Sequence, residues 1–229
     1  MKHTIANAVV DERGRLAAAI SETGELAFVA DGKGEPSVRV ADPNDELRVS
    51  LVADQLLAVD HSKATVAVVD PTTGVQSVFT IDVPRDGELQ LTEKMTGSRL
   101  WMVHVGAGRL LGVDVESGDQ KKFDLAEVQG HDLGAPLANG AFVYLPDFQL
   151  GALLKIDAET GKVVDRIRVV DANDPAKDAA DGRTFTAFVK DDRVWGNDPR
   201  GQVAVVIDRA GNAQQIEKYR EGLPTNDDL

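Results

Sequence analysis

The chain has 229 residues, 42% of them hydrophobic, and it contains no cysteine. This apolar content supports a packed core and argues against disorder, and the absence of cysteine excludes disulfides and thiolate metal sites. The net charge of −13 argues against general nucleic-acid binding and against anionic membrane surfaces, because both need lysine and arginine to neutralise phosphate.

The distribution of apolar residues argues against a membrane-spanning helix and against a signal peptide. A membrane-spanning helix needs about 18 or more consecutive apolar residues, and the sequence has no such run. The first 14 residues, MKHTIANAVVDERG, lack a basic region followed by an apolar stretch, so we expect no signal peptide in this chain.

In chain order, the sequence predicts a recurring unit of four short strands separated by turns. The clearest copy of its middle part is residues 141–162, AFVYLPDFQLGALLKIDAETGK. The five units span residues 6–42, 46–83, 88–128, 132–170 and 183–219. In the third unit the first predicted strand is 89–95, LQLTEKM. The acidic stretch 171–182 is an irregular insertion, and 220–229 is a polar tail.

Two landmarks define the repeat. An aspartate ends the third strand of each unit, and a glycine follows within four residues, as expected of a turn that needs a positive φ. These aspartates are Asp31, Asp70, Asp114, Asp157 and Asp208, at intervals of 39, 44, 43 and 51 residues by subtraction. The second landmark lies about ten residues earlier, at the end of the second strand: Ser21, Asp60, His104, Asp147 and Asp198.

A period of about 40–50 residues with four strands per unit is typical of a β-propeller blade. We therefore predict an all-β, single-domain propeller of five four-stranded blades over residues 1–229. Two architectures stay open, a closed five-bladed ring and five blades of a larger ring. We favour the closed ring, because an open arc would expose the apolar faces of both end blades.

The last two units, over residues 130–219, resemble the propeller regions of bacterial surface proteins that carry fibronectin type III domains. The segments with this resemblance are HDLGAPLANGAFVYLPDFQLGALLKIDAETGKVV and DRVWGNDPRGQVAVVIDRAGNAQQIEKY. The resemblance implies an adhesive or scaffolding role outside the cytoplasm, and it supplies no catalytic motif. More distantly, the units are similar to lactonase-like, quinoprotein and NHL-type propellers.

The second-strand landmark is the candidate site. In a propeller the turns between the second and third strands gather at one end of the channel, so Asp60, His104, Asp147 and Asp198 should ring that end. Three carboxylates and an imidazole there could bind Ca²⁺ or a cationic ligand. The alternative, which we favour, is that each side chain caps its own turn by accepting backbone N–H bonds. The aspartates after the third strands are also explained by turn chemistry.

Two functions follow from this sequence. The first is a non-catalytic interaction or scaffolding module of a cell-surface or secreted assembly, without a cofactor, which binds other proteins through the loop face and can form oligomers. The second is a lactonase-like hydrolase that uses a divalent cation held by the four ring residues. No Gly-x-Ser-x-Gly motif or paired-histidine metal motif is present to favour the enzyme.

Overall fold

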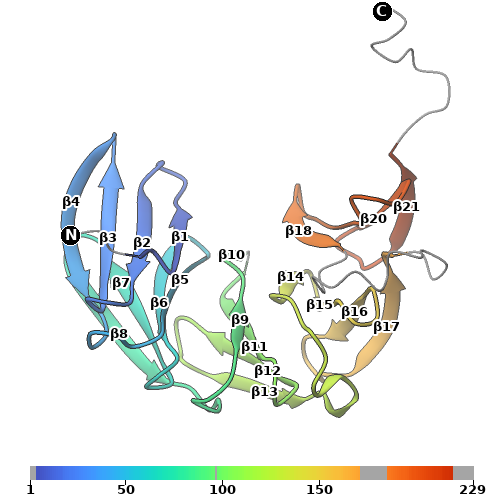
Figure 1. The fold of residues 1–229 in the computed structure, drawn as a ribbon, viewed down its shortest axis with the longest axis horizontal. Helices are drawn as coiled ribbons and strands as arrows, with labels where there is room; N and C mark the ends of the chain where they lie inside the picture. Colours follow the sequence, from blue (N-terminus) through green and yellow to red (C-terminus); the bar gives the residue numbers. More distant parts are fainter. Residues whose placement is uncertain (1–3, 96, 171–184, 219–229) are drawn as a thin grey trace, which may run out of the picture. The chain divides into compact units, whose positions relative to one another are not determined.

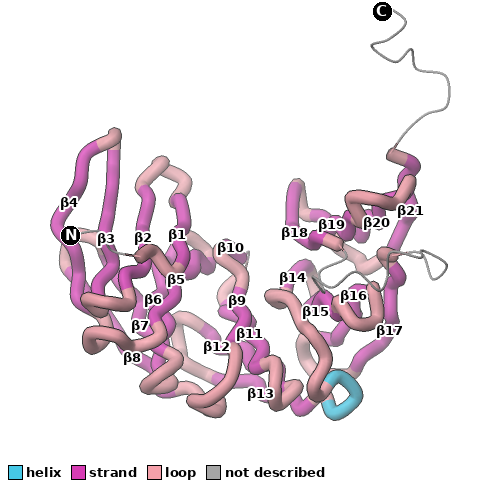
Figure 2. Tube along the Cα trace, in the orientation of Figure 1, coloured by secondary structure: helices cyan, strands magenta, loops and turns pink. Residues whose placement is uncertain are grey.

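The computed structural model describes residues 4–95, 97–170 and 185–218, and the regular structure in these ranges is almost entirely β (Figures 1 and 2). The chain divides into two compact units, residues 1–131 and 132–229. The first unit holds three sheets and the second holds two, which gives the five sheets predicted from the repeat. Among the described residues, no helix is long and apolar enough to cross a membrane.

In the first unit, each sheet is built on four antiparallel strands. The strands of the first sheet are β1 (Asn7–Val10), β2 (Leu16–Ile20), β3 (Glu25–Ala30) and β4 (Lys33–Arg39). The second sheet contains β5 (Leu47–Val52), β6 (Gln55–Asp60), β7 (Thr65–Asp70) and β8 (Gly74–Thr80). The third contains β9 (Leu89–Leu91), β11 (Arg99–His104), β12 (Arg109–Asp114) and β13 (Gln120–Asp124), followed by a 3₁₀ turn at Ala126–Val128.

The second unit repeats the arrangement twice. The fourth sheet contains β14 (Leu137–Asn139), β15 (Phe142–Asp147), β16 (Ala152–Asp157) and β17 (Val163–Arg168). The fifth contains β18 (Thr186–Lys190), β19 (Arg193–Asn197), β20 (Val203–Ile207) and β21 (Ala213–Glu217). The predicted insertion 171–182 and the tail 220–229 lie outside the described residues.

The prediction of one continuous strand over 89–95 was wrong. Residues Leu89–Leu91 form β9 of the third sheet, whereas Lys94–Met95 form a short strand, β10, that pairs in parallel with β5 of the second sheet. The amide of Leu51 donates to the carbonyl of Glu93 at 2.8 Å, which fixes this pairing. Alternating apolar residues suit either sheet, so the pattern alone does not show where the chain leaves one sheet for the other.

The first blade also closes its third turn differently from the rest. Ala30 pairs with Lys33, which leaves a two-residue loop of Asp31 and Gly32 with φ of 50° and 71°. Two consecutive positive φ values define the type I′ hairpin, for which Asp-Gly is a preferred pair. The landmark glycine of this blade is therefore Gly32, and Gly34 lies inside β4.

The core lies between adjacent sheets. The second strand of the second sheet, β6, is buried along nearly its whole length. The residues of the outer strand β8 are partly buried or exposed. One apolar cluster joins the first and second sheets through residues such as Phe28 and Leu51. Another joins the fourth and fifth sheets through residues such as Tyr144 and Val205. Burial on both faces explains why the inner strands are nearly continuous apolar runs.

Hydrogen bonds from asparagine side chains also connect neighbouring blades. The side-chain amide of Asn7 donates to the carbonyl of Val49 at 2.8 Å and accepts from the amide of the same residue at 2.8 Å. In the second unit, the side chain of Asn139 donates to the carbonyl of Asp192 at 3.0 Å. Both asparagines lie on the first strand of a blade, so they hold that strand against the following blade.

Candidate functional site

The predicted ring residues lie at the expected position in each sheet. Asp60, His104 and Asp147 end β6, β11 and β15, and Asp198 directly follows β19. Their side chains are all buried, with exposed fractions of 3%, 5%, 0% and 1% in that order. Ser21, the equivalent residue of the first blade, follows β2, and its hydroxyl accepts from the amide of Leu47.

Each ring residue caps its own turn, as the favoured interpretation predicts. The side chains accept backbone N–H bonds of 2.9–3.1 Å, and the donors in chain order are Lys63, Ala107, Leu150 and Arg200. A buried carboxylate is tolerated when such donors solvate it. Capping therefore accounts for the residue type and the burial at these positions.

The four residues divide between the two units of the chain. Asp60 and His104 belong to the first unit, whereas Asp147 and Asp198 belong to the second. In the first unit, the rings of His61 and His104 meet edge to face with centroids 6.0 Å apart, so the ends of β6 and β11 are neighbours. Among the described residues, no group of three or more His, Asp or Glu side chains has an arrangement that could hold a metal ion. A shared ring of all four residues stays a prediction.

Asp60 has an unusual electrostatic environment. Burial raises the pKa of its carboxyl, and the neighbouring carboxyl of Asp45 raises that pKa further. The backbone N–H of Lys63 acts in the opposite direction. The ammonium of Lys63 lies 3.3 Å from Asp45 and 2.5 Å from Asp42. This one cation therefore partly neutralises the negative charge of both carboxylates.

His61, the residue after Asp60, has a structural role that the sequence did not reveal. Its Nδ1 atom lies 3.0 Å from Oε2 of Glu46, and its Nε2 atom lies 2.8 Å from the carbonyl oxygen of Pro84. The imidazole of His61 is 2% exposed. Glu46 precedes β5 and Pro84 follows β8, so one histidine ties together the entry and exit of the second blade. No local sequence signal links these three positions.

The aspartates that end the third strands are turn residues, as predicted. Oδ1 of Asp70 accepts from the amides of Thr72 and Thr73 at 2.8 and 2.7 Å and from the Thr73 hydroxyl at 3.0 Å. Asp114 and Asp157 accept the same three bonds from their own turns. These bonds stabilise the charged form and hold the pKa values of Asp70 and Asp114 below the ordinary range.

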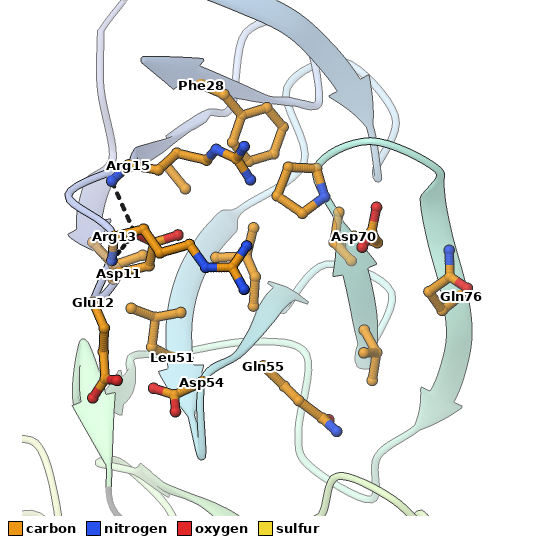
Figure 3. A pocket seen from close by; sticks show the side chains of 16 residues that line it. Asp11, Glu12, Arg13, Arg15, Phe28, Leu51, Asp54, Gln55, Asp70 and Gln76 are labelled. Atoms are coloured by element: carbon orange, nitrogen blue, oxygen red, sulfur yellow. Dashed lines mark hydrogen bonds between the residues drawn. The ribbon is translucent and has the colours of Figure 1, made fainter. Parts of the chain in front are cut away.

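The structure also contains a cleft that the sequence did not reveal. It lies between the first and second sheets, has a volume of about 680 Å³, and opens where the β1–β2, β5–β6 and β7–β8 turns meet (Figure 3). Its apolar lining includes Val9, Phe28, Leu51, Leu56 and Val69. The cleft therefore combines an apolar floor from two blades with a polar rim from three turns.

Some charged groups of the rim are already engaged. Oδ1 of Asp11 accepts from the amides of Arg13 and Arg15 at 2.9 and 2.8 Å, the bonds drawn in Figure 3. Nε of Arg15 lies 3.0 Å from Oε2 of Glu35, an ion pair without a well-aligned hydrogen bond. Asp70 is held by its own turn.

Other polar groups of the rim make no such contacts. Within the described part of the chain, the side chains of Arg13, Asp54 and Gln55 take part in no hydrogen bond or ion pair. Oε1 of Gln55 is buried and has no hydrogen-bond partner there. A buried amide oxygen without a donor is unfavourable, so it is a natural contact point for a ligand.

No protein-family model and no curated protein matches the sequence. Solved structures do match in fold. A streptogramin B lyase superimposes with a TM-score of 0.66 at 11% identity, over 96% of this chain and 69% of the other. The chain has a β-propeller fold.

Other solved propellers agree. The virginiamycin B lyase from Staphylococcus aureus matches with a TM-score of 0.61 at 13% identity, over 96% of this chain and 70% of the lyase. BamB from Moraxella catarrhalis matches with a TM-score of 0.59 at 16% identity, over 92% of this chain and 63% of BamB. At these identities the likeness concerns the fold alone. The comparisons support a propeller but do not bear on fibronectin type III domains, so that resemblance and the closure of the ring stay predictions.

Proposed function

We propose that this propeller is a non-catalytic interaction module that presents its turns to other proteins. The observation that carries the proposal is the use of the buried ring side chains. Asp60, His104, Asp147 and Asp198 each accept a hydrogen bond from their own turn, which makes these turns rigid. Rigid turns lose little conformational entropy on binding, and this favours a preformed recognition surface.

The proposed location is the cell surface or the extracellular space, in keeping with the resemblance of the last two blades to surface-protein propellers. Detection of the protein on intact cells of its source, by antibody labelling or surface biotinylation, tests this location. Labelling only after lysis would contradict it.

A direct test of the function begins with chemical cross-linking of the purified chain in an extract of its source, followed by mass spectrometry. Each candidate partner is then purified and titrated against the chain by calorimetry. The proposal expects at least one partner that binds saturably with a defined stoichiometry. If every purified candidate fails to bind, the proposal is wrong.

The second candidate function is a hydrolase that uses a divalent cation at the ring. The raised pKa of Asp60 beside Asp45 favours this candidate, because perturbed carboxyls collect at catalytic sites. Thermal unfolding with Ca²⁺ or Mn²⁺ separates the two functions. A tight cation site predicts a rise of several degrees in Tm by ligand linkage, whereas the interaction module predicts no specific rise. Loss of a hydrolytic activity in the folded double variant Asp147→Asn, Asp198→Asn would establish the enzyme instead.

A further inference from the structure

We propose that the cleft between the first two blades binds an extended peptide segment of a partner protein, in which an apolar side chain neighbours a lysine or arginine. This inference rests on the proposed interaction function and assigns that function a site and a ligand class. The size and floor of the cleft, its unpaired amide and its charge each favour this ligand class.

The dimensions and floor of the cleft suit an apolar side chain. Its volume of about 680 Å³ falls within the range of about 300–1,000 Å³ that is common for ligand sites. Phe28 and Leu51 come from different blades and belong to one buried cluster, so the floor is held by the core. Burial of one leucine or phenylalanine side chain on such a floor contributes favourably because its apolar surface leaves water.

The free amide favours a peptide. Gln55 presents both an acceptor oxygen and donor N–H groups, and its oxygen lacks a hydrogen-bond donor within the described structure. A peptide group supplies the matching N–H and C=O in one unit. The guanidinium of Arg13, which extends over the cleft in Figure 3, adds donors for further backbone carbonyl oxygens.

The charge of the rim favours a cationic side chain on that peptide. Glu12 and Asp54 lie at the same end of the cleft, away from Phe28 (Figure 3). The only described ion pair of Glu12 is a long one, 3.9 Å from Lys94. The net charge of −13 over the whole chain acts in the same direction, because it attracts cationic segments over a long range. A lysine or arginine at this end can pair with both carboxylates while its apolar neighbour reaches the floor.

The experiment is a selection of random heptapeptides displayed on phage against the full chain, followed by titration of synthetic versions of the enriched peptides. The test variant is the double substitution Glu12→Gln, Asp54→Asn. Asp54 has a φ of 65° in the β5–β6 turn, and asparagine tolerates this conformation, so the fold should be kept. The matched control is Asp192→Asn, Glu217→Gln. Asp192 occupies the equivalent turn of the fifth blade with a φ of 54°, and Glu217 is exposed on β21.

The proposal expects enriched peptides that place lysine or arginine beside an aliphatic or aromatic residue. Their affinity should fall about tenfold in the test variant, since two exposed ion pairs are lost, and it should not change in the control. The affinity should also fall with added salt. Gln55→Ala should weaken binding through a separate contact without a change in the salt dependence.

Four outcomes would overturn the cleft assignment while leaving the interaction function intact. In the first, the selection enriches acidic peptides whose binding is lost in Arg13→Gln. In the second, the enriched peptides bind the test variant as tightly as the original chain. In the third, a purified protein partner binds, and the cleft substitutions do not change its affinity. A selection that enriches no peptide also overturns the assignment. The interaction function itself falls only if the cross-linked candidates fail to bind as well.

Discussion

The backbone amide of Lys63 lies 3.0 Å from Oδ1 of Asp60, at the turn where β6 passes into β7. This bond lets a carboxyl stay in a position that is 3% exposed. The same carboxyl neighbours Asp45, and burial together with that neighbour raises its pKa above the ordinary value of 3.8. A raised pKa means that the folded state binds the proton more tightly than the unfolded state does.

The first prediction follows from that sign. The contribution of Asp60 to stability is complete below its unfolded pKa and is lost as the pH rises through the higher folded value. Asp60→Asn removes the titration but keeps an oxygen that accepts the Lys63 amide. We therefore expect the variant to have a Tm equal to or above that of the original chain at pH 7. This advantage should shrink toward pH 4, as measured by thermal unfolding across pH. A lower Tm at pH 7 with no change across pH would contradict the assignment.

The second prediction tests turn capping at Asp198, whose Oδ1 accepts from the amide of Arg200 at 2.9 Å and whose side chain is buried. Asp198→Ala leaves that amide without its side-chain partner, so unfolding in urea should show a loss of about 1–3 kcal/mol. Asp198→Asn keeps the acceptor and should lose much less. Equal losses in both variants would mean that the charge, and not the turn bond, explains this residue.

The third prediction concerns the opposite end of the blades. The bonds from Thr73 and Thr72 hold the pKa of Asp70 below its ordinary value, so its stabilising effect is present above that value and is lost as the pH falls through the folded pKa. Asp70→Ala should lower the Tm at pH 7, and the difference from the original chain should narrow in acid below about pH 4. Asp31→Asn is the control, because the Asp31-Gly32 turn depends on backbone conformation and asparagine accepts a positive φ. A difference in Tm between Asp70→Ala and the original chain that widens in acid would be inconsistent with this role of Asp70.

A fourth prediction addresses contact between blades two and three. A Cβ atom on Gly118 would lie 2.4 Å from Cδ1 of Phe79, at a φ of 78°. Gly14 has the same φ of 78° with no atom within 4 Å of such a Cβ, so Gly14→Ala measures the backbone effect alone. We expect Gly14→Ala to lose about 1 kcal/mol in urea unfolding and Gly118→Ala to lose about 1–3 kcal/mol more. Equal losses would show that Phe79 moves aside without penalty.

The extent to which sequence predicts this molecule depends on how local each feature is. Asp70 and Gly74 define a turn within five residues, and such turns recur, so the five sheets could be counted from sequence. The strand break before Lys94 was missed because the partner of β10 is β5, more than 40 positions earlier in the chain. The cleft was missed for the same reason, since Arg13 and Asp54 come from different blades and only packing of the sheets brings them to one opening.

The ring residues show a different limit. Asp60 and Asp147 were placed correctly at strand ends, because a repeat fixes equivalent positions. Whether such residues bind a ligand depends on what their oxygens contact, and the capping bonds from Lys63 and Leu150 emerge only in the folded turns. The effect of Asp45 on the pKa of Asp60 could be found only from the three-dimensional structure, because no spacing rule pairs a linker residue with a strand end.

The last prediction concerns the outer face of the fifth blade. Phe188 stacks on Trp195 with ring centroids 6.3 Å apart and planes inclined by 4°. Val194, the neighbour of Trp195 in β19, points the other way into the cluster shared with the fourth blade, because side chains alternate along a strand. Phe188 is 42% exposed on this open face. Closure of the ring, as predicted from the sequence, would cover Phe188 and Trp195 with another blade.

Acrylamide quenching tests this closure. The chain has two tryptophans, and Trp101 is 4% exposed in the third blade, so Trp101→Phe leaves Trp195 as the only reporter. A closed ring predicts that Trp195 is shielded in the native variant and becomes quenchable only on unfolding in urea. The reciprocal variant Trp195→Phe supplies the reference for a fully buried indole, because its fluorescence comes from Trp101 alone. Quenching of native Trp195 well above that reference would show that the outer face of the fifth blade is open to solvent, and the closed five-bladed ring would then be wrong.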